Sequence, residues 1–142
     1  MDLVIIVRDA LASSVIGSLL LAVEAKKAEQ TVGVVFTQEA LAALAQGSFA
    51  WPRELTGQAM RLTLADRGAA LGVPLLARGE GRQLDAKAMV AKTAEAGVTL
   101  YACPLWSSLL GLDGRLPTGL QAIETVDLLA LVRDARQVIG TL

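Results

Sequence analysis

The 142-residue sequence contains no histidine and only one cysteine, Cys103. Without histidine the chain cannot build a Ser-His-Asp or Cys-His catalytic pair or a zinc site with imidazole ligands. With one cysteine it has no internal disulfide, no cysteine zinc cage and no CxxC redox pair. Any thiol chemistry must therefore use Cys103 alone or with a partner protein's cysteine, and we expect no metal site and no cofactor.

Charge is also scarce. Charged residues make up 19% of the chain and the net charge is −1. The Lys and Arg residues are scattered and form no stripe that could neutralise phosphates, so we expect no nucleic-acid partner. The most apolar stretch, Ser14–Ala25, is interrupted by Gly17, Ser18 and Glu24 and is too short for a bilayer span. The sequence therefore predicts no membrane span. Because no basic leader follows Met1, we expect a cytoplasmic protein.

Apolar residues are abundant instead. They account for 54% of the sequence, and the mean hydropathy is +0.52. Such an excess is high for a soluble chain and suggests burial between subunits. We therefore expect a homo-oligomer that buries more than about 800 Å² per chain.

Three short apolar runs rich in β-branched residues are typical of strands buried on both faces, as in a parallel sheet. Segments of helical period separate them. This alternation predicts an α/β fold in which residues 1–142 form one domain, a three-layer sandwich with a mainly parallel sheet flanked by helices. The three runs are Leu3–Val7, Val32–Phe36 and Val98–Ala102.

The remaining elements have weaker patterns. A helix is predicted from about Gln58 to Leu71, followed by a fourth strand at Val73–Ala77 and a loop at Arg78–Gln83. Near the end of the chain, Leu120–Glu124 is predicted to add a short strand to the parallel sheet. The sequence from Val126 to Ile139 is predicted to be a terminal helix.

Cys103 directly follows a predicted strand and precedes Pro104. Ligands and catalytic groups of open parallel sheets collect at the carboxyl ends of strands. Since proline favours the first helical position, Cys103 is predicted to be a helix N-cap, where the partial positive charge of the helix favours a thiolate. Position alone leaves two interpretations open: a reactive thiol, or a small buried apolar residue without chemistry.

Three other residues are candidates for the rim of the same site. Arg8 and Thr37 follow the first and second predicted strands, and Ser107 lies in the short helix after Cys103. Each also has a structural explanation, since Arg8 could lie in a solvated turn and Thr37 could cap the next helix. Thr125 precedes a first turn with an acidic residue and is predicted to be another helix cap.

The region around Cys103 resembles the DsrE/DsrF-like family, which has a YchN-type fold. The resemblance is good over Ala86–Arg136 and moderate over Leu3–Leu44, and it leaves Gln46–Arg82 mostly uncovered. The matching positions are Gly97-Val98, Ala102-Cys103, Leu110-Gly111, the Leu-x-x-Gly at Leu116–Gly119, and Phe36-Thr37 at the end of the second strand.

The resemblance implies a small cytoplasmic homo-oligomer with a parallel sheet flanked by helices. In the sulfur-relay members of the family the matching cysteine carries a persulfide, so Cys103 would be the sulfur carrier, with a sulfur donor or acceptor protein as partner. A carrier needs neither histidine nor a second cysteine in the same chain. The alternatives are a non-catalytic oligomeric binding module of the same fold and a single-cysteine redox sensor.

Overall fold

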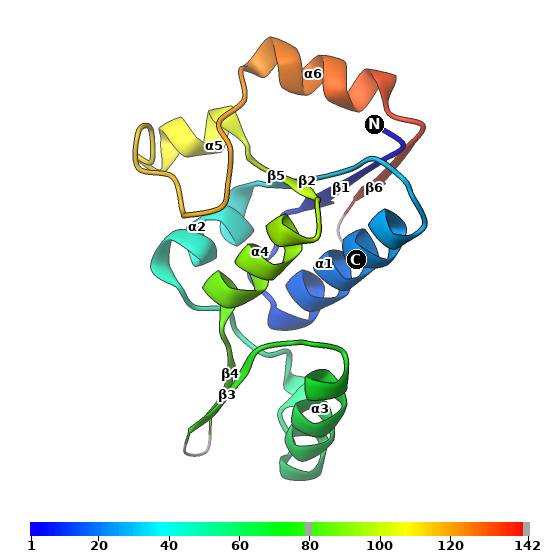
Figure 1. The fold of residues 1–142 in the computed structure, drawn as a ribbon. Coiled ribbons are helices and arrows are strands. Elements are labelled where there is room, and N and C mark those ends of the chain that lie inside the picture. The colour runs from blue at the N-terminus through cyan, green and yellow to red at the C-terminus, as the bar shows by residue number, and fades with distance from the viewer. Residues whose placement is uncertain (79–80, 141–142) are drawn as a thin grey trace.

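The three apolar runs of the sequence form three strands of a parallel sheet in the computed structural model, which describes residues 1–78 and 81–140. The four-stranded sheet has the order β5-β2-β1-β6 (Figure 1). All three of its strand pairings are parallel. The fold is therefore the predicted α/β sandwich with a parallel sheet. Its strands are β1 (Leu3–Val7), β2 (Val32–Phe36), β5 (Thr99–Ala102) and β6 (Gln137–Gly140).

Side chains on β1 alternate between two buried clusters, one on each face of the sheet. Leu3, Ile5 and Val7 belong to the larger cluster, whereas Val4 belongs to the smaller one. Helices therefore cover both faces, with α6 on the side opposite α1 and α4 in Figure 1. The larger cluster receives side chains from α1 (Ala12–Lys27), α2 (Gln38–Gln46) and α4 (Ala86–Glu95), and the smaller one from α6 (Thr125–Asp134).

The last strand of the parallel sheet does not lie at Leu120–Glu124, where the sequence predicts it. Leu120–Glu124 forms no strand and contributes a single bridge, Gln121 to Tyr101, because α6 begins directly afterwards at Thr125. The predicted terminal helix ends early, at Asp134, and Gln137–Gly140 becomes β6. One edge of β1 has no other strand partner, so Gln137–Gly140 pairs with it. This tertiary pairing overrides the local helical pattern of these residues.

The cap at the start of α6 also differs from the prediction. Thr125 is the first residue of the helix, and Glu124 is its N-cap, with φ −74° and ψ 151°. By contrast, the predicted glycine ends of two helices are found: Gly47 and Gly97 both adopt positive φ values, 78° and 96°. Only such a left-handed conformation lets the chain leave these helices sharply, and glycine adopts it without a steric penalty.

The middle of the chain forms an arm (residues 53–84) that projects from the sheet domain (Figure 1). The predicted fourth strand at Val73–Ala77 begins only at Leu75 and does not join the parallel sheet. The predicted loop at Arg78–Gln83 is also wrong, because strands occupy most of it, while residues 79–80 lie outside the described residues. The elements of the arm are η1 (Arg53–Leu55), α3 (Gln58–Ala70) and an antiparallel hairpin of β3 (Leu75–Arg78) and β4 (Gly81–Leu84).

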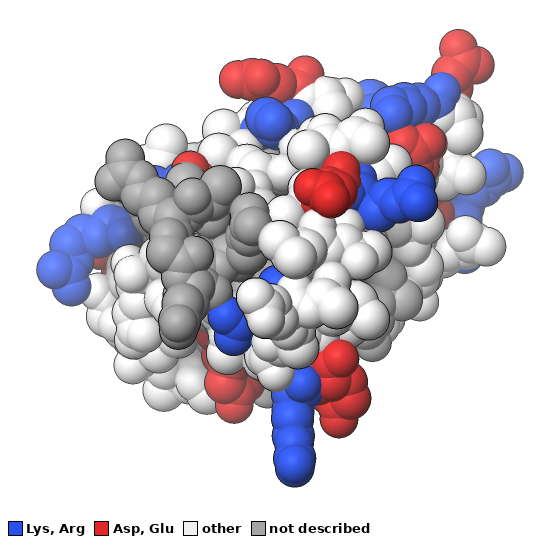
Figure 2. Space-filling view, turned by 90° about the horizontal axis from the view of Figure 1, so that it is seen from below, with Lys and Arg blue, Asp and Glu red and all other residues white. Residues whose placement is uncertain are grey.

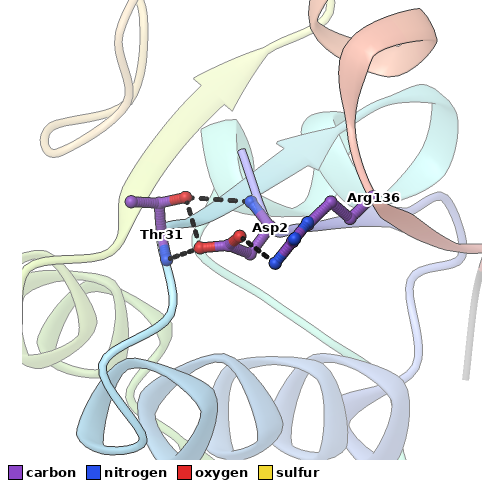
Figure 3. A network of polar contacts seen from close by, with 3 residues as sticks. All are labelled: Asp2, Thr31 and Arg136. Carbon is purple, nitrogen blue, oxygen red and sulfur yellow. Dashed lines mark hydrogen bonds and ion pairs between the residues drawn. The ribbon is translucent and has the colours of Figure 1, made fainter.

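Polar contacts at the amino ends of the strands join three distant parts of the chain (Figure 3). The backbone amide and the hydroxyl of Thr31 donate to Oδ2 of Asp2, at 2.8 and 2.9 Å. Arg136, just before β6, places Nη1 3.5 Å from Oδ1 of Asp2. These hydrogen bonds, the backbone one first, and the nearby guanidinium lower the pKa of Asp2 below its ordinary value.

We predict that this network makes folding stability depend on pH in the acid range. The pKa of Asp2 is lower in the folded protein than the ordinary 3.8, so its stabilising contribution is present above about pH 4 and is lost as the pH falls through the folded pKa. Thermal unfolding of wild type and Asp2→Asn from pH 6 to pH 2 should therefore show a larger stability difference at the upper end. A constant difference across this range would contradict the prediction.

The segment between α5 (Pro104–Leu109) and α6 packs against α4 through Gly119. This glycine has φ +96°, and a Cβ added to it would lie 2.8 Å from Cγ1 of Val90, a buried residue of α4. Gly114 has a similar φ, +72°, but a Cβ there would meet nothing within 4 Å. Gly119 is therefore required for space as well as for backbone conformation.

We predict that Gly119→Ala destabilises the protein more than Gly114→Ala does. Both variants place a Cβ on a left-handed residue, but only the first forces an overpacked contact, which typically adds about 1–3 kcal/mol. Urea unfolding of the two variants measures the difference in the free energy of unfolding. Equal losses would show that close packing at Gly119 contributes nothing.

Candidate functional site

Backbone hydrogen bonds align the carboxyl ends of three neighbouring strands. The amide of Thr37 donates to the carbonyl of Val7 at 3.0 Å, and the amide of Cys103 donates to the carbonyl of Phe36 at 2.9 Å. The pairing of β1 with β2 and of β2 with β5 thus continues past the strand ends. Cys103 is held directly beside the end of β2, at the edge where parallel sheets place their ligands.

Cys103 is the N-cap of α5, and Pro104 begins the helix. Its thiol makes no capping hydrogen bond, and the residue is 8% exposed. It belongs to the smaller apolar cluster, with Val4 and Val35 as the other buried members. The sulfur therefore lies in largely apolar surroundings on the α6 face of the sheet, and little of the residue reaches solvent.

The three rim candidates lie at different distances from Cys103. Thr37 is its close neighbour, since it follows Phe36 on the adjacent strand, and it is buried. Ser107 lies one helical turn further along, and its amide donates to the carbonyl of Cys103 at 2.8 Å. Arg8 is exposed at the end of β1, with β2 between it and β5, so their backbones are about 9–10 Å apart. The structure thus brings Thr37 and Ser107 to Cys103 and leaves Arg8 further away.

A hollow of about 290 Å³ lies between α5 and the segment that leads into α6. Ala102 and Pro104, the residues on either side of Cys103, line it together with Ser107. The hydroxyl of Ser107 is buried and has no hydrogen-bond partner. The wall also includes Ser108, whose hydroxyl donates to Asp113 at 2.9 Å. Gly114, Glu124 and Thr125 line the hollow as well.

Two details at this edge go beyond the prediction of a turn after the first strand. Gln38, the first residue of α2, has φ +52°, an unusual value for a residue other than glycine. Asp9 accepts hydrogen bonds from the amide of Leu11 and the hydroxyl of Ser14, at 3.1 and 3.0 Å, and so fixes the turn from β1 into α1. The aspartate before a helix was a usable signal for that turn, whereas nothing in the sequence marks Gln38 for a left-handed conformation.

Within residues 1–78 and 81–140, no group of three or more Cys, Asp and Glu side chains is placed to hold a metal ion. Nor does any helix in them have the length and apolar character needed to cross a bilayer.

The architecture, an open parallel sheet with helices on both faces, matches solved structures. The crystal structure of the YchN protein from E. coli matches with a TM-score of 0.63 over 99% of this chain and 98% of that chain, at 16% sequence identity. A conserved protein of unknown function from Bacteroides thetaiotaomicron matches with a TM-score of 0.55 over 98% and 94%, at 8% identity. No family model and no curated protein matches the sequence. The expected YchN-type, DsrE/DsrF-like fold is therefore confirmed at the level of structure.

We predict that the buried hydroxyl of Ser107 contributes nothing to stability. Ser107→Ala removes an unpartnered polar group, so the free energy of unfolding should stay the same or rise by up to about 1 kcal/mol. Ser18→Ala should behave likewise, because its hydroxyl is also buried without a partner. Ser14→Ala, the matched control, loses the bond to Asp9 and should cost about 1 kcal/mol. A clear loss of stability in Ser107→Ala would contradict the prediction.

Proposed function

We propose that this protein carries sulfur as a persulfide on Cys103. The observation that carries the proposal is the position of the only thiol, at the carboxyl end of β5 and beside the end of β2, in a chain with the YchN-type fold. Two backbone bonds fix this position, because the amide of Cys103 donates to Phe36 and its carbonyl accepts from Ser107. The thiol is therefore held in one place at the edge of the sheet.

The chemistry requires only one thiolate. The Cys103 thiolate attacks the outer sulfur of a donor persulfide, a new S–S bond forms at Cys103, and the donor's S–S bond breaks to release its thiolate. An acceptor thiolate then attacks the outer sulfur of the Cys103 persulfide. The S–S bond at Cys103 breaks, the outer sulfur stays on the acceptor, and Cys103 is released as a thiolate. No oxidant and no second cysteine are consumed. Because the residue is 8% exposed among apolar side chains, a donor must displace neighbouring side chains to reach the sulfur.

Entry to the site is expected from the side of the hollow beside α5. Ala102 and Pro104, the neighbours of Cys103 in the chain, line the hollow, so a donor persulfide seated there would lie beside the backbone of Cys103, while the thiol itself packs with Val4 and Val35. The hydroxyl of Ser108 and the carboxylate of Asp113 are polar groups in the wall of the hollow. A donor protein presenting a persulfide, or an acceptor protein presenting a thiol, is the partner that this arrangement fits. A reducing compartment such as the cytoplasm, where a single thiol stays free, fits it as well.

A non-catalytic binding module is the second candidate, and the burial of Cys103 is the observation that favours it. A cysteine that is 8% exposed among apolar side chains can serve as a packing residue only. The redox-sensor alternative has less support, because peroxide-sensing thiols are typically solvent-accessible. The carrier and the binding module differ in one measurable property, the ability of Cys103 to accept sulfur.

We predict that wild-type protein treated with cysteine persulfide gains one sulfur atom per chain, removable by a thiol reductant, and that Cys103→Ser gains none. Intact-protein mass spectrometry measures the gain, and circular dichroism checks that the variant stays folded. Ser107→Ala serves as a second variant that keeps the thiol. If wild type gains no sulfur while a free-cysteine control does, the carrier function is rejected in favour of the binding module.

A further inference from the structure

Helix α6 covers the apolar cluster that contains Cys103, yet none of its own residues is buried. Leu128 and Leu131 pack against that cluster and are only partly buried, whereas Val126 and Leu129 are 71% and 66% exposed. Apolar side chains therefore lie on both the covered and the uncovered side of α6. Because packing on the sheet removes only part of its apolar surface from water, the hydrophobic effect holds this helix less firmly than the helices of the main core.

Backbone hydrogen bonds fix the chain on both sides of this helix. Before α6, Gln121 exchanges two bonds with β5, at 2.7 and 3.0 Å. After it, the amides of Arg136 and Gln137 donate to the carbonyls of the first two residues of the chain, at 3.2 and 3.0 Å. Between these points lies the α6 segment (residues 122–135). Over the ranges 1–78 and 81–140, this segment makes hydrogen bonds and ion pairs only within itself, so apolar contacts alone attach it to the sheet.

Long-range electrostatics do not hold the α6 segment either. The net charge of the chain is −1, and on the face away from α6 Lys and Arg lie among Asp and Glu (Figure 2). At the end of α6, Arg133 and Asp134 pair with each other at 2.7 Å, and both side chains are largely exposed. An exposed pair of this kind contributes little to stability. The charges therefore do not oppose a movement of the helix away from the sheet.

One end of the α6 segment already borders empty space. Ile123, Glu124 and Thr125 line the hollow of about 290 Å³ described above. Ala102 and Pro104, on either side of Cys103 in the chain, line the same hollow. A movement of the segment at this end would therefore widen a space that already reaches the backbone beside the cysteine.

The α6 segment can open at a lower free energy than the sheet. A helix of 10 residues is marginally stable by itself in water, so α6 depends on the cluster beneath it. All residues of β2, by contrast, are buried. Elements with few buried apolar contacts open locally while the core stays folded. We therefore expect α6 to detach while β1 and β2 remain paired.

We propose that the α6 segment is a lid over Cys103, which detaches between its two fixed ends and so admits a reacting molecule to the thiol. As an account of sulfur transfer, the lid rests on the carrier function proposed above. The opening itself is measured with an alkylating reagent, which requires no persulfide. A protein whose thiol is alkylated through opening of α6 but gains no sulfur from a persulfide would keep the lid and lose the carrier function.

The first experiment follows the alkylation of Cys103 by iodoacetamide in wild-type protein, at urea concentrations below the unfolding transition, by intact-protein mass spectrometry. Because the lid is mostly closed, the thiol should react at least about tenfold more slowly than in the unfolded chain. The logarithm of the rate should rise with urea at less than about half the slope of global unfolding, since opening exposes only one helix. A rate equal to that of the unfolded chain, or a slope equal to that of global unfolding, overturns the proposal.

The second experiment compares Leu131→Ala with Leu129→Ala, its matched control on the same helix. Both variants make the same change in helix propensity, but only Leu131 packs against the cluster of Cys103. Without urea, Leu131→Ala should raise the alkylation rate at least about fivefold, and Leu129→Ala less than about twofold, because only the first removes contacts that close the lid. Circular dichroism checks that both variants are folded. Equal rates in the two variants would show that the thiol is reached by another route and would overturn the proposal.

Discussion

The need to bury both faces of β1 and β2 organises the rest of the molecule. Their residues are apolar on each side, so one layer of helices is not enough. Helices α1, α2 and α4 cover one face, and the chain must then pass the sheet edge after β5 to place α6 on the other. Cys103 lies where that passage begins, and this explains why a residue at a strand end is packed beneath α6 and does not project into solvent.

The sequence predicted correctly the strands that are buried, because buried strands have continuous apolar sequences. These strands are Leu3–Val7, Val32–Phe36 and the run before Cys103. The edge strand β6 is mostly exposed and carries no such run, so its local pattern continued that of the helix before it. The hairpin of the arm lies away from the sheet; the predicted strand at Val73–Ala77 overlaps β3, whereas β4 was predicted as a loop. Whether an element pairs at an edge depends on which backbone lies open beside it, and that is a property of the assembled fold.

For the candidate site, the sequence located Cys103 at a helix start because the Cys-Pro pair follows directly on a strand. Proximity across strands was harder to infer. Thr37 and Arg8 both follow strands, yet only the first lies next to Cys103, since the strand order places β2 between β1 and β5. The orientation of the thiol and the left-handed Gln38 depend on packing and on the start of α2, for which no residue pattern exists. Residue types thus predicted which residues lie at the carboxyl ends of the strands. The strand order determines which of them lie next to Cys103.

The pairing of β1 with β6 also determines the order in which the protein can be made. Leu3 pairs with Gln137, so one side of β1 has no strand partner until residues 137–140 have been synthesised. Loop closure over this span is slow compared with local pairing, and an apolar parallel strand with a free edge readily associates with other chains. We therefore infer that the nascent chain completes its sheet only after release of residues 137–140 from the ribosome.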